Sequence, residues 1–215
     1  MTVAGKPGAE FDGALLGTPC WLELLSGERV ALPVHRWRLP PGRGDQFLLS
    51  RCSGPTLDVG CGPGRLTAAL GERKVPALGI DVSATAVRLT RQRGALALHR
   101  DVFDPVPGEG RWRHVLLADG NIGIGGDPVA LLLRVRELLA ERGTALLELE
   151  PPGRGLRRDH VRVRENRGQS RGPDHWFRWA WLGLDALDAV TSAAALRVNR
   201  TAELGGRWFA ELVRA

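Results

Sequence analysis

Residues 58–64 read Asp-Val-Gly-Cys-Gly-Pro-Gly, a carboxylate followed by three glycines at alternate positions. Because glycine has no side chain, such a segment turns sharply and lets a ligand approach its backbone amides. An apolar run (56–60) precedes it, and a helical pattern (65–72) follows. The unpaired N–H groups of a helix start suit a carboxylate or a phosphate. The spacing therefore predicts a ligand-binding turn between a strand and a helix.

Asp81 is the acidic partner that such a turn needs. It stands 17 residues after Gly64, at the end of a second apolar run (75–80). A carboxylate at this place accepts hydrogen bonds from both hydroxyls of a ribose. A glycine-rich turn alone is weak evidence, but the strand before it, the helix after it and Asp81 together are specific for a nucleoside cofactor.

Two cofactors compete for this site. Dinucleotide binders place their third glycine one position later, where this chain has Arg65, and the chain contains no tyrosine for the Tyr/Lys pair of short-chain dehydrogenases. The pattern D-x-G-x-G-x-G instead resembles the first motif of class I S-adenosylmethionine-dependent methyltransferases. The resemblance covers roughly residues 56–215.

That resemblance implies S-adenosylmethionine as cofactor, S-adenosylhomocysteine as product, and no metal. The glycines would pack against the methionine part, and the acidic residues at successive strand ends would meet its amino group, the ribose, the adenine and the reacting methyl group. The residues implied are Asp58, Gly60, Gly62, Gly64, Asp81, Val82, Asp101, Val102 and Asp119. Asp101, Asp119 and Asn121 are also typical turn formers, and Cys61 is expected to be a small packed residue rather than a nucleophile.

The catalytic base stays open. A methyl group on a sulfonium is already activated, so a base is needed only for an acceptor that arrives protonated. Asp119, His35 and His175 are the candidates, and His160 lies in the same flanking regions. His114, at the start of a predicted strand, would lie at the opposite end of the sheet from the site.

Strands and helices alternate along the central part of the chain. Helical patterns follow Ser83 and span 128–142, the latter ended by Gly143, and strands are expected at 95–98, 113–118 and 144–149. A helix (184–195) and two strands (196–204, 207–213) joined by Gly205-Gly206 complete the chain. With the resemblance, the pattern predicts an α/β, Rossmann-like, doubly wound fold. Its mostly parallel seven-stranded sheet ends in an antiparallel hairpin, with an N-terminal cap and an insertion after the fifth strand.

Two regions flank the predicted methyltransferase domain (56–215). Residues 1–55 form an N-terminal extension or cap with a hairpin (20–25, 29–34) and a short helix ending near Cys52. Residues 151–182 form a substrate-side insertion with two added strands near 160–164 and 176–181. The insertion is rich in arginine and tryptophan, which predicts either a basic, aromatic pocket wall or a solvated face over a tryptophan-bearing core. Its members are Arg154, Arg157, Arg158, Arg162, Arg164, Arg167, Arg171, Trp176, Trp179 and Trp181.

The composition of the chain bears on its cellular location and its partners. The chain has 215 residues and a formal charge of +6, nearly all of the basic residues being arginine, and compositional bias explains the charge at least as well as an anionic partner does. The sequence shows no apolar run of membrane length and no signal-peptide pattern. Its three cysteines form no metal-ligand pair. We therefore expect a cytoplasmic protein without a membrane partner.

Three functions remain open. The first is methyl transfer to a small molecule, anionic or aromatic, such as a specialised metabolite. The second is RNA methylation, although no Asn/Asp-Pro-Pro-aromatic motif follows the fourth strand to favour base amines. The third is a non-catalytic cofactor-binding interaction module. Aminopropyl transfer ranks below these, because no acidic polyamine pocket is evident. The acceptor atom and the oligomeric state are not determined by the sequence.

Overall fold

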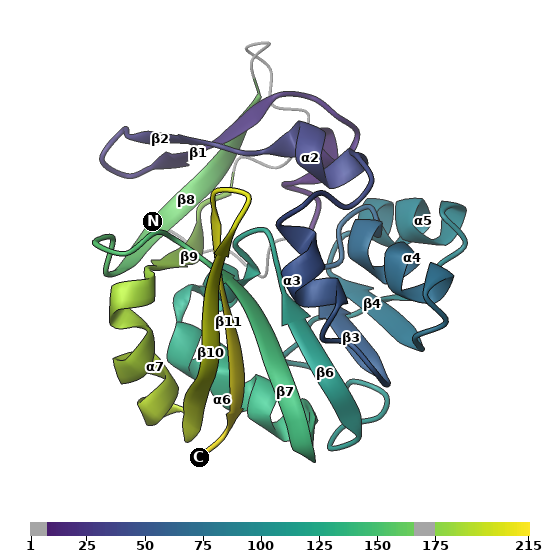
Figure 1. Cartoon of the computed structure of the whole chain (residues 1–215). Helices are drawn as coiled ribbons and strands as arrows, with labels where there is room; N and C mark the ends of the chain where they lie inside the picture. The colour runs from purple at the N-terminus through teal and green to yellow at the C-terminus, as the bar shows by residue number, and fades with distance from the viewer. Residues whose placement is uncertain (1–7, 166–174) are drawn as a thin grey trace.

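The computed structural model describes residues 8–165 and 175–215, and in them a seven-stranded sheet forms the centre of the molecule (Figure 1). The strand order is β10-β11-β7-β6-β3-β4-β5. Strands β3 to β7 pair in parallel, and β11 pairs antiparallel with both β7 and β10. The strands are β3 (Thr56–Val59), β4 (Ala77–Asp81), β5 (Ala97–His99), β6 (Trp112–Leu117), β7 (Leu139–Leu149), β10 (Leu196–Leu204) and β11 (Arg207–Arg214). The predicted mostly parallel sheet with a terminal antiparallel hairpin is confirmed.

Helices cover both faces of this sheet because successive strand residues point to opposite sides. In β6, Val115 and Leu117 belong to the core cluster under α6 (Pro128–Leu138) and α7 (Leu187–Ala193). Leu116, between them, belongs to the cluster under α3 (Asp45–Leu49) and α4 (Arg65–Glu72). Helix α5 (Ala84–Gln92) packs beside β4 and β5. This two-sided apolar packing is what holds the carboxyl ends of the strands at one common edge.

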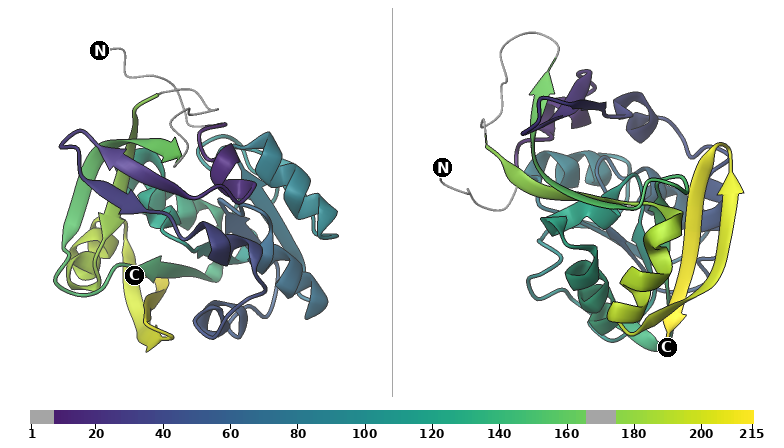
Figure 2. Two further views of the ribbon diagram at one scale, coloured as in Figure 1. Left: turned by 90° about the horizontal axis from the view of Figure 1, so that it is seen from above. Right: turned by 90° about the vertical axis from the view of Figure 1, so that its left-hand side faces the viewer.

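A second, four-stranded sheet lies above that edge (Figures 1 and 2). Its order is β2-β1-β8-β9, with β1 (Cys20–Leu24), β2 (Arg29–Ala31), β8 (Leu156–Glu165) and β9 (Phe177–Leu182). Strand β1 pairs antiparallel with β8, so the N-terminal region and the segment after β7 form one layer rather than two separate additions. We call this sheet, with α1 (Asp12–Leu15) and α2 (Val34–Arg38), the cap.

Several predicted element boundaries are wrong. Helix α6 ends at Leu138 rather than at residue 142, because Leu139 is already extended and pairs with Trp112. Gly143 therefore lies inside β7, where an added Cβ would be 2.8 Å from the backbone oxygen of Trp112. Pro33 ends the second strand of the first hairpin early, and α2 begins at Val34. Helix α7 begins at Leu187, after a 3₁₀ turn, rather than at residue 184.

Among the residues that the structure describes, no helix is long and apolar enough to span a membrane.

Candidate functional site

The turn between β3 and α4 owes its shape to glycine. Gly60 has φ of +68°, and a Cβ there would lie 2.6 Å from the side-chain nitrogen of Asn121. Gly64, at the N-cap of α4, has φ of +80°, and a Cβ there would lie 2.8 Å from the Cα of Thr90. Both positions combine left-handed backbone with close packing, so only glycine fits without strain.

A cavity of about 390 Å³ opens over this turn, at the carboxyl ends of β3, β4 and β6. All but one of the residues that the sequence assigned to a cofactor border it: Asp58, Gly60, Gly62, Asp81, Val82, Asp101, Val102 and Asp119. Gly64 does not border the cavity and instead packs against Thr90. Tertiary structure thus brings together residues spread over about 60 positions of the chain.

The carboxylate of Asp81 is held in one orientation. Its two oxygens accept hydrogen bonds from the backbone N–H of Gly62 at 2.9 Å and of Ser83 at 2.8 Å. Burial raises the pKa of this carboxyl above its ordinary value, against those two hydrogen bonds. Each oxygen retains acceptor capacity toward the cavity, since a carboxylate oxygen accepts two hydrogen bonds.

Asp58 lies deeper, at the end of β3. Its side chain is buried and accepts a hydrogen bond of 2.7 Å from the hydroxyl of Thr67. Burial raises the pKa of Asp58 to about 6, because a charge is costly to remove from water. A cationic ligand group beside this carboxylate would offset that cost.

Asp101 and Val82 border the far end of the cavity. Asp101 accepts a hydrogen bond of 2.9 Å from the backbone N–H of Phe103, the geometry of an Asx turn. The carbonyl of Val82 lies 2.8 Å from Nε2 of His99, and Val102 is buried. Asp101 therefore both forms an Asx turn and borders the cavity.

Asp119 and Asn121 follow β6 in a strained turn. Asp119 has φ of +53°, and its backbone N–H donates to the carboxylate of Glu148 at 2.6 Å. The side-chain amide of Asn121 donates to the carbonyls of Val59 (2.9 Å) and Gly60 (2.8 Å). Asn121 thereby joins this turn to the glycine turn, a role that the sequence pattern did not indicate.

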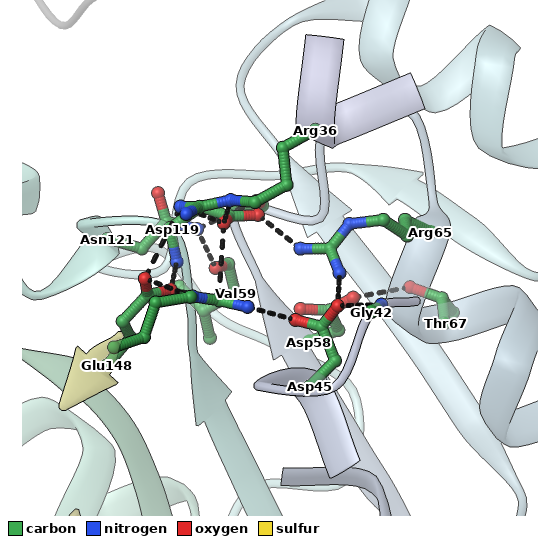
Figure 3. A network of polar contacts seen from close by, with 12 residues as sticks. Arg36, Gly42, Asp45, Asp58, Val59, Arg65, Thr67, Asp119, Asn121 and Glu148 are labelled. Atoms are coloured by element: carbon green, nitrogen blue, oxygen red, sulfur yellow. Dashed lines mark hydrogen bonds and ion pairs between the residues drawn. The ribbon is translucent and has the colours of Figure 1, made fainter. Parts of the chain in front are cut away.

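The carboxylate of Asp119 forms ion pairs rather than standing free (Figure 3). It accepts from Arg36 at 2.7 Å and from Arg65 at 2.6 Å. Both oxygens of Asp119 are thus engaged by guanidinium groups, and Arg207 approaches one of them at 3.5 Å. The arrangement disfavours Asp119 as a general base.

The histidines proposed as bases lie elsewhere. His35, on α2, and His175, just before β9, are exposed and do not border the cavity, nor does His160 in β8. His114 is buried at the start of β6, at the opposite end of the sheet, within 3.1 Å of the backbone nitrogen of Ser53. Burial lowers the pKa of His114 to about 4. Cys61 borders the cavity, but burial raises the pKa of its thiol well above the usual range, so it stays protonated.

Of the two alternatives for the insertion, the solvated face agrees with the described arginines that were named for the pocket wall. Arg157 pairs with Glu28, Arg158 with Asp127, and Arg162 and Arg164 both with Glu23, and these residues do not border the cavity. Arg162 and Arg164 alternate with Val161 and Val163 in β8, so they point away from the apolar side of the cap. Arg154, Trp176 and Trp181 also do not border the cavity, whereas Trp179 does. Arg167 and Arg171 lie outside the described residues.

The cap side of the cavity is aromatic and apolar instead. Phe11 and Trp179 pack with ring centroids 5.9 Å apart, and Phe11 and Phe177 with centroids 5.7 Å apart. Sequence reasoning named Trp179 but missed Phe11 and Phe177, and also the cap residues Leu15, Leu32, Trp37 and Arg178. It also missed Phe103, after β5, and Ile124, after β6, which border the cavity from the main-sheet side. The alternation of Phe177 and Trp179 in β9 is the one local signal that could have indicated the aromatic side.

Comparison with known proteins indicates which class of protein this chain resembles. Residues 57–120, which include the glycine turn and Asp81, match the family model of a methyltransferase domain. No curated protein is similar enough in sequence to match the chain. A methyltransferase from Bacteroides fragilis, solved with S-adenosyl-L-homocysteine, is 19% identical with a TM-score of 0.74 over 100% of both chains.

Two further solved structures resemble this one less closely. The CcbJ methyltransferase from Streptomyces caelestis is 16% identical with a TM-score of 0.61, over 82% of this chain and 91% of that one. The 1,6-didemethyltoxoflavin-N1-methyltransferase from Burkholderia thailandensis is 16% identical with a TM-score of 0.57, over 79% and 74%.

The strand order and the glycine turn beside the cavity are those of a class I, Rossmann-like fold. Residues 57–120 carry the match to the methyltransferase domain, and the chain shares its fold with solved S-adenosylmethionine-dependent methyltransferases.

Proposed function

We propose that the cavity holds S-adenosylmethionine on its glycine side and a small, largely apolar methyl acceptor on its cap side. The residues proposed to contact the cofactor are Asp58, Gly60, Gly62, Asp81, Val82, Asp101, Val102 and Asp119, with Gly64 shaping the turn. The cap would close over the acceptor.

The groups present suit this cofactor. Asp81 offers two oriented acceptors for a pair of hydroxyls, and Asp58 offers a buried carboxylate that a cation would stabilise. The backbone at Gly60 and Gly62 is bare of side chains on the cavity wall. Phe103 and Val102 supply an apolar border suited to a planar base.

The aromatic cap side is the observation that supports a small acceptor. Phe11, Phe177 and Trp179 enclose the cavity opposite the glycine turn. Such a wall binds an apolar or aromatic molecule by burial and ring contacts, and it excludes water from the reaction. Solved neighbours include a 1,6-didemethyltoxoflavin methyltransferase and a glycopeptide N-methyltransferase, which supports a specialised metabolite as the acceptor.

The chemistry asks little of the protein beyond positioning. The cofactor supplies a methyl group on a positively charged sulfur, and this chain's residues hold the acceptor in line with it. An acceptor that presents a free lone pair needs no general base. Asp119 is engaged by arginines, and the proposed histidines lie away from the cavity. This arrangement favours such an acceptor.

Calorimetric titration with S-adenosylmethionine and S-adenosylhomocysteine tests the cofactor site. We expect Asp81→Ala to weaken both affinities about a hundredfold, or about 2.7 kcal/mol. Transfer of labelled methyl groups to a panel of planar heteroaromatic and amine-bearing small molecules then tests the acceptor. If the wild-type protein binds neither ligand, the assignment of the cavity to this cofactor is overturned. If RNA is labelled and no small molecule is, RNA methylation replaces small-molecule methylation as the proposed function.

A further inference from the structure

Six charged side chains form a closed ring at the carboxyl edge of the main sheet. The ring runs Arg36–Asp119–Arg65–Asp45–Arg207–Glu148 and back to Arg36. The N···O distances are 2.7 Å for Arg36–Asp119, 2.6 Å for Arg65–Asp119, 2.7 Å for Arg207–Asp45, 2.5 Å for Arg207–Glu148 and 3.3 Å for Arg36–Glu148. Three guanidinium groups alternate with three carboxylates, so the ring as a whole is neutral.

Each member comes from a different part of the fold. Arg36 lies on α2 of the cap, Asp45 on α3 and Arg65 at the start of α4, directly after the glycine turn. The other three are Asp119, after β6, and Glu148 and Arg207, in the adjacent strands β7 and β11. Figure 3 shows Arg36 and Arg65 reaching Asp119 from separate elements. Contacts between such distant segments tie the cap, the glycine turn and the terminal hairpin to one point.

The ring is largely removed from water. The side chains of Asp45 and Arg65 are 0% and 3% exposed, whereas that of Arg36 is 30% exposed. Burial alone would raise the pKa of Asp45, but hydrogen bonds from Arg65 and Arg207 outweigh it and hold the pKa below its ordinary value. Because the buried members are charged, deleting a single charge would leave the rest uncompensated in a medium that screens poorly.

The ring also borders the cavity. Asp119 and Arg65 line it, and so does Trp37, the neighbour of Arg36 on α2. The Nε of Arg65 is buried without a hydrogen-bond partner among the described residues. Two charged members of the ring, Asp119 and Arg65, therefore border the proposed cofactor seat. Asn121 also connects the Asp119 turn to the backbone of the glycine turn, at the carbonyls of Val59 and Gly60.

We propose that this neutral ring is a positioning device that sets how strongly the site distinguishes the cationic cofactor from its neutral product, with Arg36 as the member that docks the cap. The inference rests on the proposed seat of the cofactor over the glycine turn. S-adenosylmethionine and S-adenosylhomocysteine differ by one methyl group and one positive charge. A change in the ring's net charge must therefore shift their two affinities unequally, whereas loss of packing weakens both alike.

The test is the ratio of the dissociation constants for the two ligands, Kd of S-adenosylhomocysteine over Kd of S-adenosylmethionine. Arg36→Gln leaves the ring with one excess negative charge, so the ratio should rise about three- to tenfold. Asp119→Asn leaves one excess positive charge, so the ratio should fall by a similar factor. The double variant is neutral again and should return the ratio to the wild-type value. Both ligands should also bind more weakly to Arg36→Gln, because α2 loses its docking contact.

Two controls separate the possible failures. Arg43→Ala removes an exposed cationic charge from the same N-terminal segment outside the ring and should leave the ratio unchanged. Arg36→Lys keeps the charge and should keep the ratio, while its loss of the two-nitrogen contact weakens both affinities. Melting temperatures report whether each variant folds; Arg36, the most exposed member, is the variant expected to remain closest to wild type.

A ratio that stays constant in folded Arg36→Gln and Asp119→Asn would overturn the inference, and so would a double variant that fails to restore it. If Asp81→Ala leaves both affinities unchanged, the proposed cofactor seat has failed instead. If Asp81→Ala weakens binding and the ring variants do not move the ratio, only the ring's role has failed.

Discussion

At the scale of single residues, the site is built from side chains whose surroundings change their chemistry. Asp58 is a carboxylate whose pKa rises to about 6 because it is buried. Asp119 is a carboxylate held between guanidinium groups. Gly60 and Gly64 provide backbone shapes that other residues adopt only under strain. The same residue types in water would provide none of these properties.

Asp58 predicts a pH dependence of cofactor binding. A cationic amino group beside Asp58 favours its ionised form, so binding releases the proton that Asp58 holds below pH 6. Affinity for S-adenosylmethionine should therefore rise as the pH increases through about 6 and level off above it. Calorimetry between pH 5 and pH 8 in two buffers of different ionisation enthalpy measures the proton release. Asp58→Asn should remove this dependence, and an unchanged profile in that variant would contradict the assignment.

The surroundings of Gly64 predict that even an alanine there lowers the stability of the protein considerably. Gly64→Ala should lower the free energy of unfolding by about 3 kcal/mol, because left-handed backbone and a close approach to Thr90 add together. Gly27→Ala is a matched control, since Gly27 has φ of +85° but no atom within 4 Å of an added Cβ. Its cost should be only about 1 kcal/mol. Urea titration of both variants checks the difference, and equal losses would mean that the Thr90 contact is relieved by movement.

At the scale of elements, N-cap residues stabilise the first turns of α5 and α6 and contact neighbouring segments. Ser83 accepts a hydrogen bond from the backbone N–H of Ala86 at the start of α5, and its hydroxyl donates to Asp12 of α1 at 2.6 Å. Asp127 caps α6 through the N–H of Val129. Ser83 also joins α1 of the cap to α5 through its short hydrogen bond to Asp12, whereas Asp127 meets β8 through an exposed ion pair with Arg158 at 3.4 Å.

Ser83→Ala and Asp127→Ala should therefore differ in binding but not greatly in stability. Each should cost about 1 kcal/mol of unfolding free energy, the usual value of an N-cap. Only Ser83→Ala should also weaken S-adenosylhomocysteine binding, by about threefold, because Asp12 of α1 loses one of its two hydrogen bonds to the start of α5 beside the cavity and keeps only that from Thr85. Denaturation curves and calorimetry measure the two effects. Equal affinities in the two variants would show that the Ser83–Asp12 contact does not position the site.

At the scale of the whole molecule, the cavity over the glycine turn is lined by residues of both the cap and the seven-stranded sheet. A ligand bound there contacts both layers and should stabilise them as one unit. At a concentration one hundred times its Kd, S-adenosylhomocysteine should add about 2.7 kcal/mol to the free energy of unfolding, which corresponds to a rise of about 5 to 10 °C in Tm.

Thermal melting and limited proteolysis with S-adenosylhomocysteine check this coupling. Cleavage within β1 and β2 of the cap should slow together with cleavage in the main sheet. Protection of the main sheet alone would show that the cap opens independently of the loaded cofactor site.

The spacing of residue types along the chain was enough to predict the central sheet and the glycine turn. The glycines of residues 58–64 predicted the sharp turn between β3 and α4, and Asp81 lies beside the same cavity. The strand–helix alternation with Gly205-Gly206 predicted the parallel sheet and its hairpin. These features depend on backbone conformation and side-chain periodicity, which a short stretch of sequence specifies by itself.

Only the tertiary structure decided the rest. Pairing of β1 with β8 joined two flanking regions into one cap, turned Arg162 and Arg164 away from the cavity, and left Phe177 and Trp179 facing it. The charged ring joins Arg36 to Glu148 and Arg207 across most of the chain. Such contacts depend on which distant segments come together, and a single sequence holds no local signal for that, because each partner is an ordinary arginine or carboxylate until the fold removes it from water.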